Sequence, residues 1–175
     1  MKFNFENLDD FTRKLMQDEI NYDIEREQLY LSKRFNDVGQ NIYKDLLYEA
    51  VENGDEETLA SSLNNNGCFK SHEERKTKSG VTLAKVPENA NVTLAESEFN
   101  RFYIRGLCLR AIQAGQKIQI YRARHSDNPR AESITLIDKI IEPEKLLSDL
   151  RTSIGIDTVL GLPPGPNSGL SVKLI

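Results

Sequence analysis

The chain has 175 residues, of which 38% are hydrophobic and 29% charged, and its net charge at pH 7 is −4. This length suits one domain with appendages, and the composition is typical of a folded chain and excludes a largely disordered one. No run approaches the roughly 18 apolar residues that a membrane span requires, so no membrane partner is expected.

The first residues and the cysteines indicate the cellular compartment of the protein. The start, "MKFNFENLDDF", is acidic where a secretion signal would carry an apolar core. Cys68 and Cys108 lie in unlike contexts and do not form a disulfide framework. We therefore expect an intracellular protein, or one that is made inside a cell and later becomes part of a particle.

Charge is distributed unevenly along the chain. Residues 1–98 carry a net charge of −8 and residues 131–175 carry −2, whereas residues 99–130 carry +6. A basic segment in an acidic chain can pair with the rest of the chain, with a second copy, or with an anionic partner.

The first part of the chain, residues 1–66, is expected to be a helical region. Asn7 is a candidate N-cap with acidic residues after it, and Gly54 is a candidate helix stop. Apolar residues recur at helical spacing between these signals. Helices are expected over residues 7–20, 38–53 and 55–63.

Residues 67–92 are expected to form an exposed connector. They are polar, with charges of both signs and a proline, and only "VTLAKV" alternates like a strand. His72 lies here with only Cys68 at ligand spacing, and two ligands do not make a metal site.

Residues 93–160 are expected to form an α+β core. Thr93 and Glu96 have capping-box spacing at the start of a helix that ends at Gly115. Gly106, in the middle of this helix, costs about 1 kcal/mol relative to alanine, which a close backbone contact would explain. "KIQIYRARH" and "ITLIDKII" then predict an antiparallel hairpin, and Pro143 opens a final helix.

The last segment, residues 161–175, is predicted to be an extended arm because its three prolines exclude a helix. Its end, "GLSVKLI", alternates like a strand and could add to the edge of another sheet. The alternative is that it folds back on its own domain, on the "KIQIYRARH" hairpin. The candidate partner-binding residues are Leu162, Pro163, Pro164, Pro166, Leu170, Val172 and Leu174.

Together these elements predict an α+β fold with a helical N-terminal part, a helix–β-hairpin–helix C-terminal part and an extended C-terminal arm. Motifs for catalysis are missing from the sequence: there is no glycine-rich phosphate loop, HExxH motif or paired CxxC. A nucleophile also needs a neighbouring base, and His72 and His125 are the only histidines. We expect a protein that is not an enzyme, with no catalytic residue, cofactor or metal.

The basic segment supports an alternative function. Its arginines could neutralise phosphates, although helix and strand divide them over several faces of an acidic chain, which favours pairing with protein groups. The alternative is therefore a nucleic-acid-binding or host-defence-modulating protein that uses Arg101, Arg105, Arg122 and Arg124.

Three stretches, "ESEFNRFYIRGLCLRAI", "IYRARHSDNPRAES" and "DTVLGLPPGPNSGL", are similar to uncharacterised proteins of tailed-phage and prophage genomes. The resemblance covers residues 96–175, and no activity is assigned to that group. It implies a viral protein of the host cytoplasm or the virion, and an arm-bearing α+β chain there suggests particle assembly. The expected function is a structural or assembly protein that docks on itself, as a homo-oligomer, or on other virion proteins through its arm.

Overall fold

The computed structural model describes residues 2–155 and 168–175. Within these residues it has six helices and two small antiparallel sheets, so the fold is α+β as the sequence predicts. In chain order the elements are α1 (Asp10–Glu25), α2 (Asp37–Asn53), α3 (Glu56–Asn65), β1 (His72–Thr77), β2 (Gly80–Lys85), α4 (Ala90–Ala114), β3 (Ile118–Arg122), α5 (Ala131–Leu136), β4 (Ile140–Ile141), α6 (Pro143–Thr152) and β5 (Leu170–Leu174).

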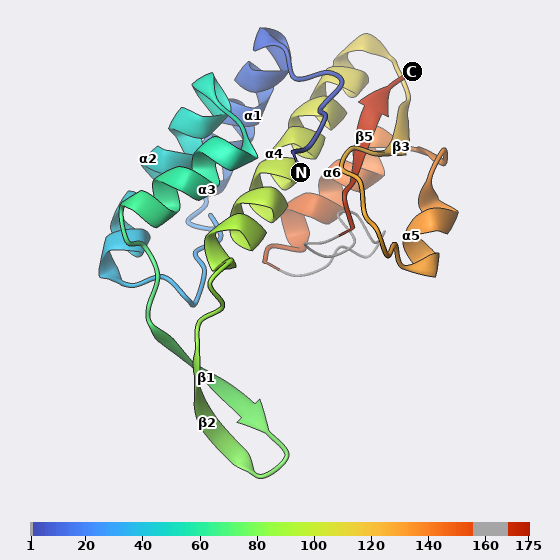
Figure 1. The fold of residues 1–175 in the computed structure, drawn as a ribbon. Coiled ribbons are helices and arrows are strands. Elements are labelled where there is room, and N and C mark those ends of the chain that lie inside the picture. Colours follow the sequence, from blue (N-terminus) through green and yellow to red (C-terminus); the bar gives the residue numbers. More distant parts are fainter. Residues whose placement is uncertain (1, 156–167) are drawn as a thin grey trace.

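Helix α4 is the centre of the body. It packs against α1, α3, α6 and β5 (Figure 1). Its side chains Phe99, Tyr103, Ile104 and Leu107 are fully buried, because apolar residues occur around most of its circumference rather than on one stripe. One hydrophobic cluster runs from Met16 in α1 through these residues to the last strand. None of the helices in the described ranges is both long and apolar enough to cross a membrane.

The end of the chain forms the edge of the body's own sheet. Strand order is β4-β3-β5, and β5 pairs antiparallel with β3 from Ile118 opposite Leu174 to Arg122 opposite Leu170. Asn100 of α4 donates to the Leu170 carbonyl at 2.9 Å, and the Ser171 hydroxyl donates to Asn100 at 2.7 Å. The strand that the sequence predicts within the arm is thus held by its own domain, as the alternative expectation had it.

Two helix starts differ from the sequence expectation. The N-cap of α1 is Asp9 and not Asn7, since the Asp9 carboxylate accepts from the Thr12 N–H at 2.9 Å. Helix α4 begins at Ala90, which leaves Thr93 inside the helix and the predicted capping box unformed. The end of α4 is confirmed at Gly115, which has a left-handed φ of 64°.

The predicted hairpin between "KIQIYRARH" and "ITLIDKII" is wrong in its second strand. Residues 131–136 form helix α5, and only Ile140–Ile141 pairs with β3. Asp138, between α5 and β4, has a φ of 67°, a left-handed conformation that a continuous strand over residues 134–141 does not adopt. The apolar alternation of residues 134–141 therefore belongs to one helical turn followed by a short strand.

Helices α4 and α1 are in close contact at Gly106. A β-carbon built on it would lie 2.9 Å from Met16 Cγ and 3.0 Å from the Met16 backbone nitrogen. The close contact that the sequence suggested at this glycine is therefore present, and it explains why the helix carries a residue of low helix propensity here.

We predict that Gly106→Ala lowers the free energy of unfolding by about 1–3 kcal/mol, as overpacked core substitutions do, although alanine favours the helix. Urea denaturation measures this change, with Gln113→Ala on an exposed part of α4 as the control. A more stable Gly106→Ala variant would show that the two helices separate without cost.

Candidate functional site

The most exposed regular structure of the described chain is the antiparallel pair of β1 and β2, here called the ribbon (residues 72–85). It projects from the body below α3 and α4 (Figure 1). Its register runs from His72 opposite Lys85 to Thr77 opposite Gly80, which leaves Lys78 and Ser79 as a two-residue turn. The sequence suggested only "VTLAKV" as strand-like, because the six charged and polar residues of β1 show no apolar alternation.

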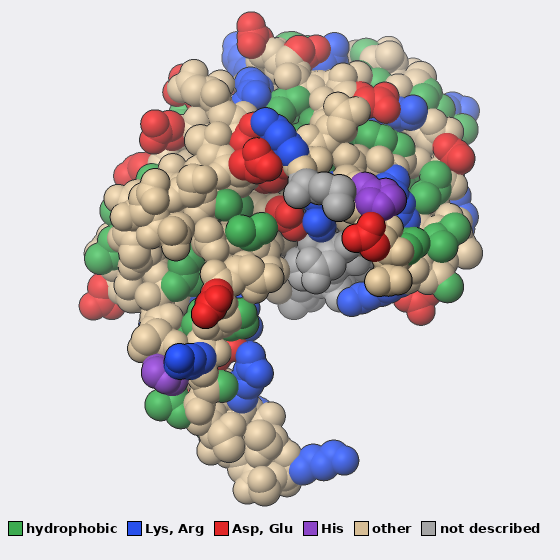
Figure 2. Space-filling model, viewed as in Figure 1, with side chains coloured by type: hydrophobic (Ala, Val, Ile, Leu, Met, Phe, Trp, Pro, Cys, Tyr) green, Lys and Arg blue, Asp and Glu red, His purple; other side chains and the backbone are tan. Residues whose placement is uncertain are grey.

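The ribbon combines basic and apolar side chains (Figure 2). Leu83 is 71% exposed and Val81 61% exposed, and they are the two most exposed large apolar side chains in the described ranges. They lie two residues apart on β2 and so share one face. The register puts Glu74 beside Leu83 and Lys76 beside Val81 on that face. This is the mixture of apolar and charged groups that a protein-binding surface presents.

The base of the ribbon is anchored to the body. Glu73 of β1 accepts from Arg34 at 2.6 Å and 3.0 Å, and this lowers the pKa of the Glu73 carboxyl. The Lys70 N–H donates to the Arg34 carbonyl at 2.8 Å, and the Phe69 ring packs against Phe35 at a tilt of 56°. The ribbon therefore leaves the body from a fixed point, and its outer part is the two-stranded sheet of β1 and β2.

The predicted docking residues of the arm lie in two different situations. Leu170 and Val172 are fully buried against the body, and Leu174 is half-buried. These three belong to the core sheet and are not free to dock on another protein while that sheet is intact. The other predicted docking residues, Leu162, Pro163, Pro164 and Pro166, lie outside the described residues.

The four arginines proposed for nucleic acid do not form one exposed surface. Arg101 and Arg105 are buried, and Arg101 donates to the Leu150 and Ser153 carbonyls. Arg122 donates to the Ser168 carbonyl at 2.8 Å, and Arg124 pairs with Glu96 at 3.3 Å. The nucleic-acid assignment is contradicted for Arg101 and Arg105, because a buried guanidinium cannot reach a phosphate.

Arg105 is the centre of a buried ion cluster. Its Nε donates to Glu19 at 2.7 Å, and its Nη1 donates to Asp23 at 2.6 Å. Arg151 of α6 also donates to Glu19, at 3.0 Å. Burial works to lower the pKa of Arg105, but bonds to Asp23 and Glu19 outweigh it and the pKa is raised. The basic segment thus pairs with the acidic first helix, one of the outcomes that the charge distribution allowed.

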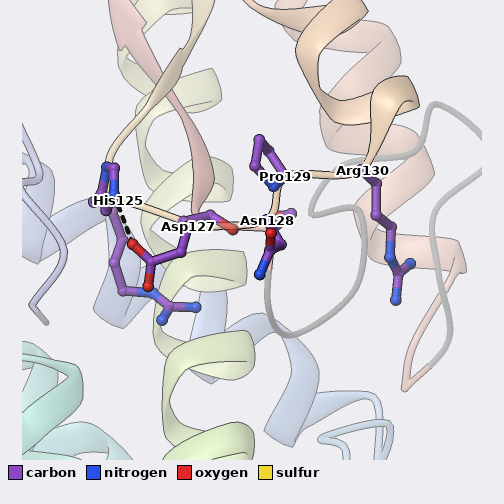
Figure 3. Close-up of a pocket in the computed structure, with 8 residues that line it drawn as sticks. His125, Asp127, Asn128, Pro129 and Arg130 are labelled. Carbon is purple, nitrogen blue, oxygen red and sulfur yellow. Dashed lines mark hydrogen bonds and ion pairs between the residues drawn. The ribbon is translucent and has the colours of Figure 1, made fainter.

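A polar pocket lies in the loop between β3 and α5 (Figure 3). The His125 ring faces the Asp127 carboxylate, 3.1 Å away, while Arg130 lies beyond Pro129. Both members of this pair are exposed, and no hydrogen bond among the described residues joins His125 to a nucleophile. Such a pair is not arranged to activate a hydroxyl or thiol.

The remaining reactive groups are enclosed. Cys108 is buried between α4 and its neighbours, and burial raises the pKa of its thiol far above the ordinary value. Burial also raises the pKa of the Cys68 thiol. Neither thiol is therefore a thiolate at neutral pH. Across residues 2–155 and 168–175, no three His, Cys, Asp or Glu side chains gather as a metal site would require.

An acidic groove lies between α3 and the start of α4. Glu56, Glu57 and Glu96 line it with several asparagines. The Glu56 carboxylate accepts from the Phe3 N–H at 2.7 Å, while its other oxygen has no hydrogen-bond partner among the described residues. Burial raises the pKa of Glu56, and the same cause raises the pKa of Glu96. The groove is a second feature that sequence reasoning missed, because its residues come from two distant segments.

Comparison with known proteins finds no relative: no family model matches the chain, and searches of curated proteins and of solved structures find no match.

Proposed function

We propose that this chain is a non-enzymatic assembly protein that docks on other protein chains, copies of itself included, through the ribbon. The supporting observation is the exposure of Val81 and Leu83 on an element that projects from the body. A two-stranded hairpin alone is marginally stable in water. A ribbon with exposed apolar side chains on one face is stabilised when a partner protein covers those side chains.

The docking element in this proposal differs from the one that the sequence suggested. Leu170 and Val172 of β5 are part of the core sheet, whereas no other strand of residues 2–155 and 168–175 pairs with either edge of the ribbon. A role in particle assembly of a phage is part of the proposal. Its support is the resemblance of residues 96–175 to tailed-phage and prophage proteins, together with the projecting ribbon.

The test is the solution mass of three forms of the chain, measured by light scattering over a range of concentrations. In one form, an Asn-Gly turn replaces residues 72–85; the Val86 N–H donates to the Ser71 carbonyl at 3.0 Å, so the ends are already adjacent. The second form carries Val81→Ser with Leu83→Ser. We expect the unmodified chain to associate and both altered forms to be monomers with an unchanged melting temperature.

A matched control carries Ile134→Ser with Ile140→Ser. Each of these side chains is 53% exposed. Ile134 lies in α5 and Ile140 in β4, and neither belongs to the ribbon. This control should associate like the unmodified chain. Association that survives removal of the ribbon, or a full chain that stays monomeric at every concentration, would refute docking between copies.

Binding of nucleic acid, the alternative function, is tested with the same forms of the chain. The ribbon and its base carry Lys70, Arg75, Lys76, Lys78 and Lys85. Binding to a DNA duplex that requires these residues and weakens steeply with salt would assign the ribbon to nucleic acid instead. We favour protein because Val81 and Leu83, the two most exposed large apolar side chains of the described residues, lie on the ribbon.

A further inference from the structure

The hydrogen-bond pattern of the ribbon identifies which edge of it can receive another strand. The Val86 N–H donates to the Ser71 carbonyl at 3.0 Å, so this pair is a bonded one. Bonded and non-bonded pairs alternate along an antiparallel ladder. With the printed register, Glu73 with Ala84 and Arg75 with Thr82 are then bonded pairs inside the ribbon.

The residues between these pairs have backbone groups that point outward. On β2 these are Val81 and Leu83, whose N–H and C=O groups face the open edge, since the described sheet holds only β1 and β2. The same two residues carry the exposed apolar side chains. Unpaired edge groups and uncovered apolar groups thus occur at the same positions, as in strands that pair with another chain.

We propose that the β2 edges of two copies pair antiparallel, with Thr82 opposite Thr82 on a two-fold axis, to give a four-stranded sheet in the order β1-β2-β2-β1. This inference rests on the proposed function and names its partner, a second copy of the chain. Because the axis passes through Thr82, Val81 of each copy lies opposite Leu83 of the other. Four apolar side chains then gather on one face.

Neighbouring registers bring less favourable side chains opposite each other. Moving the axis to Leu83 puts Val81 opposite Lys85 of the other copy, which leaves an apolar side chain beside a cation. Pairing through the β1 edge in the matching register, with the axis at Arg75, brings two arginines face to face and covers no apolar group. Like charges that are directly opposite destabilise a sheet.

The charges on the outer strands also agree with the Thr82 register. The ribbon places Glu74 beside Leu83 and Lys76 beside Val81. Across the four strands each apolar rung therefore ends in one glutamate and one lysine, and the two rungs run in opposite directions. No like charges meet on that face, and the two-fold relation closes the assembly at two copies.

The test is disulfide cross-linking of the full chain carrying Thr82→Cys. In the proposed sheet Thr82 forms a non-bonded pair with its counterpart, and such Cα atoms lie about 4.5 Å apart, within reach of a disulfide. Arg75→Cys is the matched control: it lies on the same rung one strand further out. Its Cα atoms are about 14 Å apart across three strand spacings, too far for a disulfide.

After mild oxidation, we expect Thr82→Cys to run as a covalent dimer on a non-reducing gel and Arg75→Cys to run as a monomer. The native thiols of Cys68 and Cys108 are buried and should add no background. Cross-linking of Arg75→Cys alone would overturn the proposal in favour of the β1 edge. Failure of both variants to cross-link, in chains that still associate through the ribbon, would overturn this register and leave the proposed function standing.

A second variant tests the register without thiols. Val81→Glu combined with Leu83→Lys puts a glutamate opposite a lysine twice in the Thr82 register, and inside each ribbon the new glutamate lies beside Lys76 and the new lysine beside Glu74. Association should therefore persist and should weaken with salt. Leu83→Lys alone should abolish it. If the double variant also fails to associate, Val81 and Leu83 of the two copies do not face each other and the proposal is wrong. If the unmodified chain is a monomer throughout, the proposed function itself fails.

Discussion

Replacing Arg105 by alanine is expected to lower the free energy of unfolding by about 3–5 kcal/mol, since it removes one partner of a buried ion cluster. Arg105 is fully buried, and Glu19 and Asp23 are at most 2% exposed. Without the guanidinium, the two buried carboxylates that accept from it lose its compensating charge, and Arg151 at the edge of the cluster still pairs with Glu19.

Urea denaturation at neutral pH measures this loss, and Arg110→Ala is the matched control. Arg110 lies on the same helix and pairs with Asp9, which is half-exposed at the surface. An exposed pair of this kind contributes at most about 1 kcal/mol. If the two variants lose the same stability, the cluster around Arg105 is not sealed from water as the structure has it.

Val172→Asp is expected to destabilise the chain by at least about 3 kcal/mol, because it buries a carboxylate without a partner. Val172 is fully buried, opposite Ile120 of β3. Thermal unfolding followed by circular dichroism measures the effect. The control is the next residue, Lys173→Ala, whose side chain is partly exposed and pairs loosely with Glu6 at 3.6 Å.

This second prediction separates two roles of the C-terminal strand. A strand that serves only a partner could carry an aspartate without a change in the melting temperature of its own domain. A melting temperature that does not change for Val172→Asp would therefore contradict the pairing of β5 with β3 and return the strand to a docking role.

The sequence predicted best where local signals agree. Helix α2 begins and ends within one residue of expectation, and α6 begins at the expected Pro143, because apolar spacing, a glycine stop and a proline mark these limits. It predicted poorly where the local pattern was mixed. The charged run of β1 shows no apolar alternation, and a strand of that kind depends on its neighbour β2 rather than on its own residues.

The candidate site shows the same division. Val81 and Leu83 could be noted in the sequence as part of a strand-like run, but their exposure depends on the absence of a covering element among the described residues. The arginines show the reverse. The charge of the basic segment left its partner open. Arg101 and Arg105 are buried, and their partners come from helices more than forty residues away in the chain.

By itself the sequence determined the α+β class, the limits of the helices with clear end signals, the extended course of residues 170–174 and the close approach at Gly106. Each of these follows from backbone preferences or from spacing within one segment. Only the tertiary structure decided that β5 pairs with its own β3, that the basic segment neutralises α1 and that the ribbon stands free. Those outcomes depend on which distant segments meet, and a local pattern of residues does not contain that information.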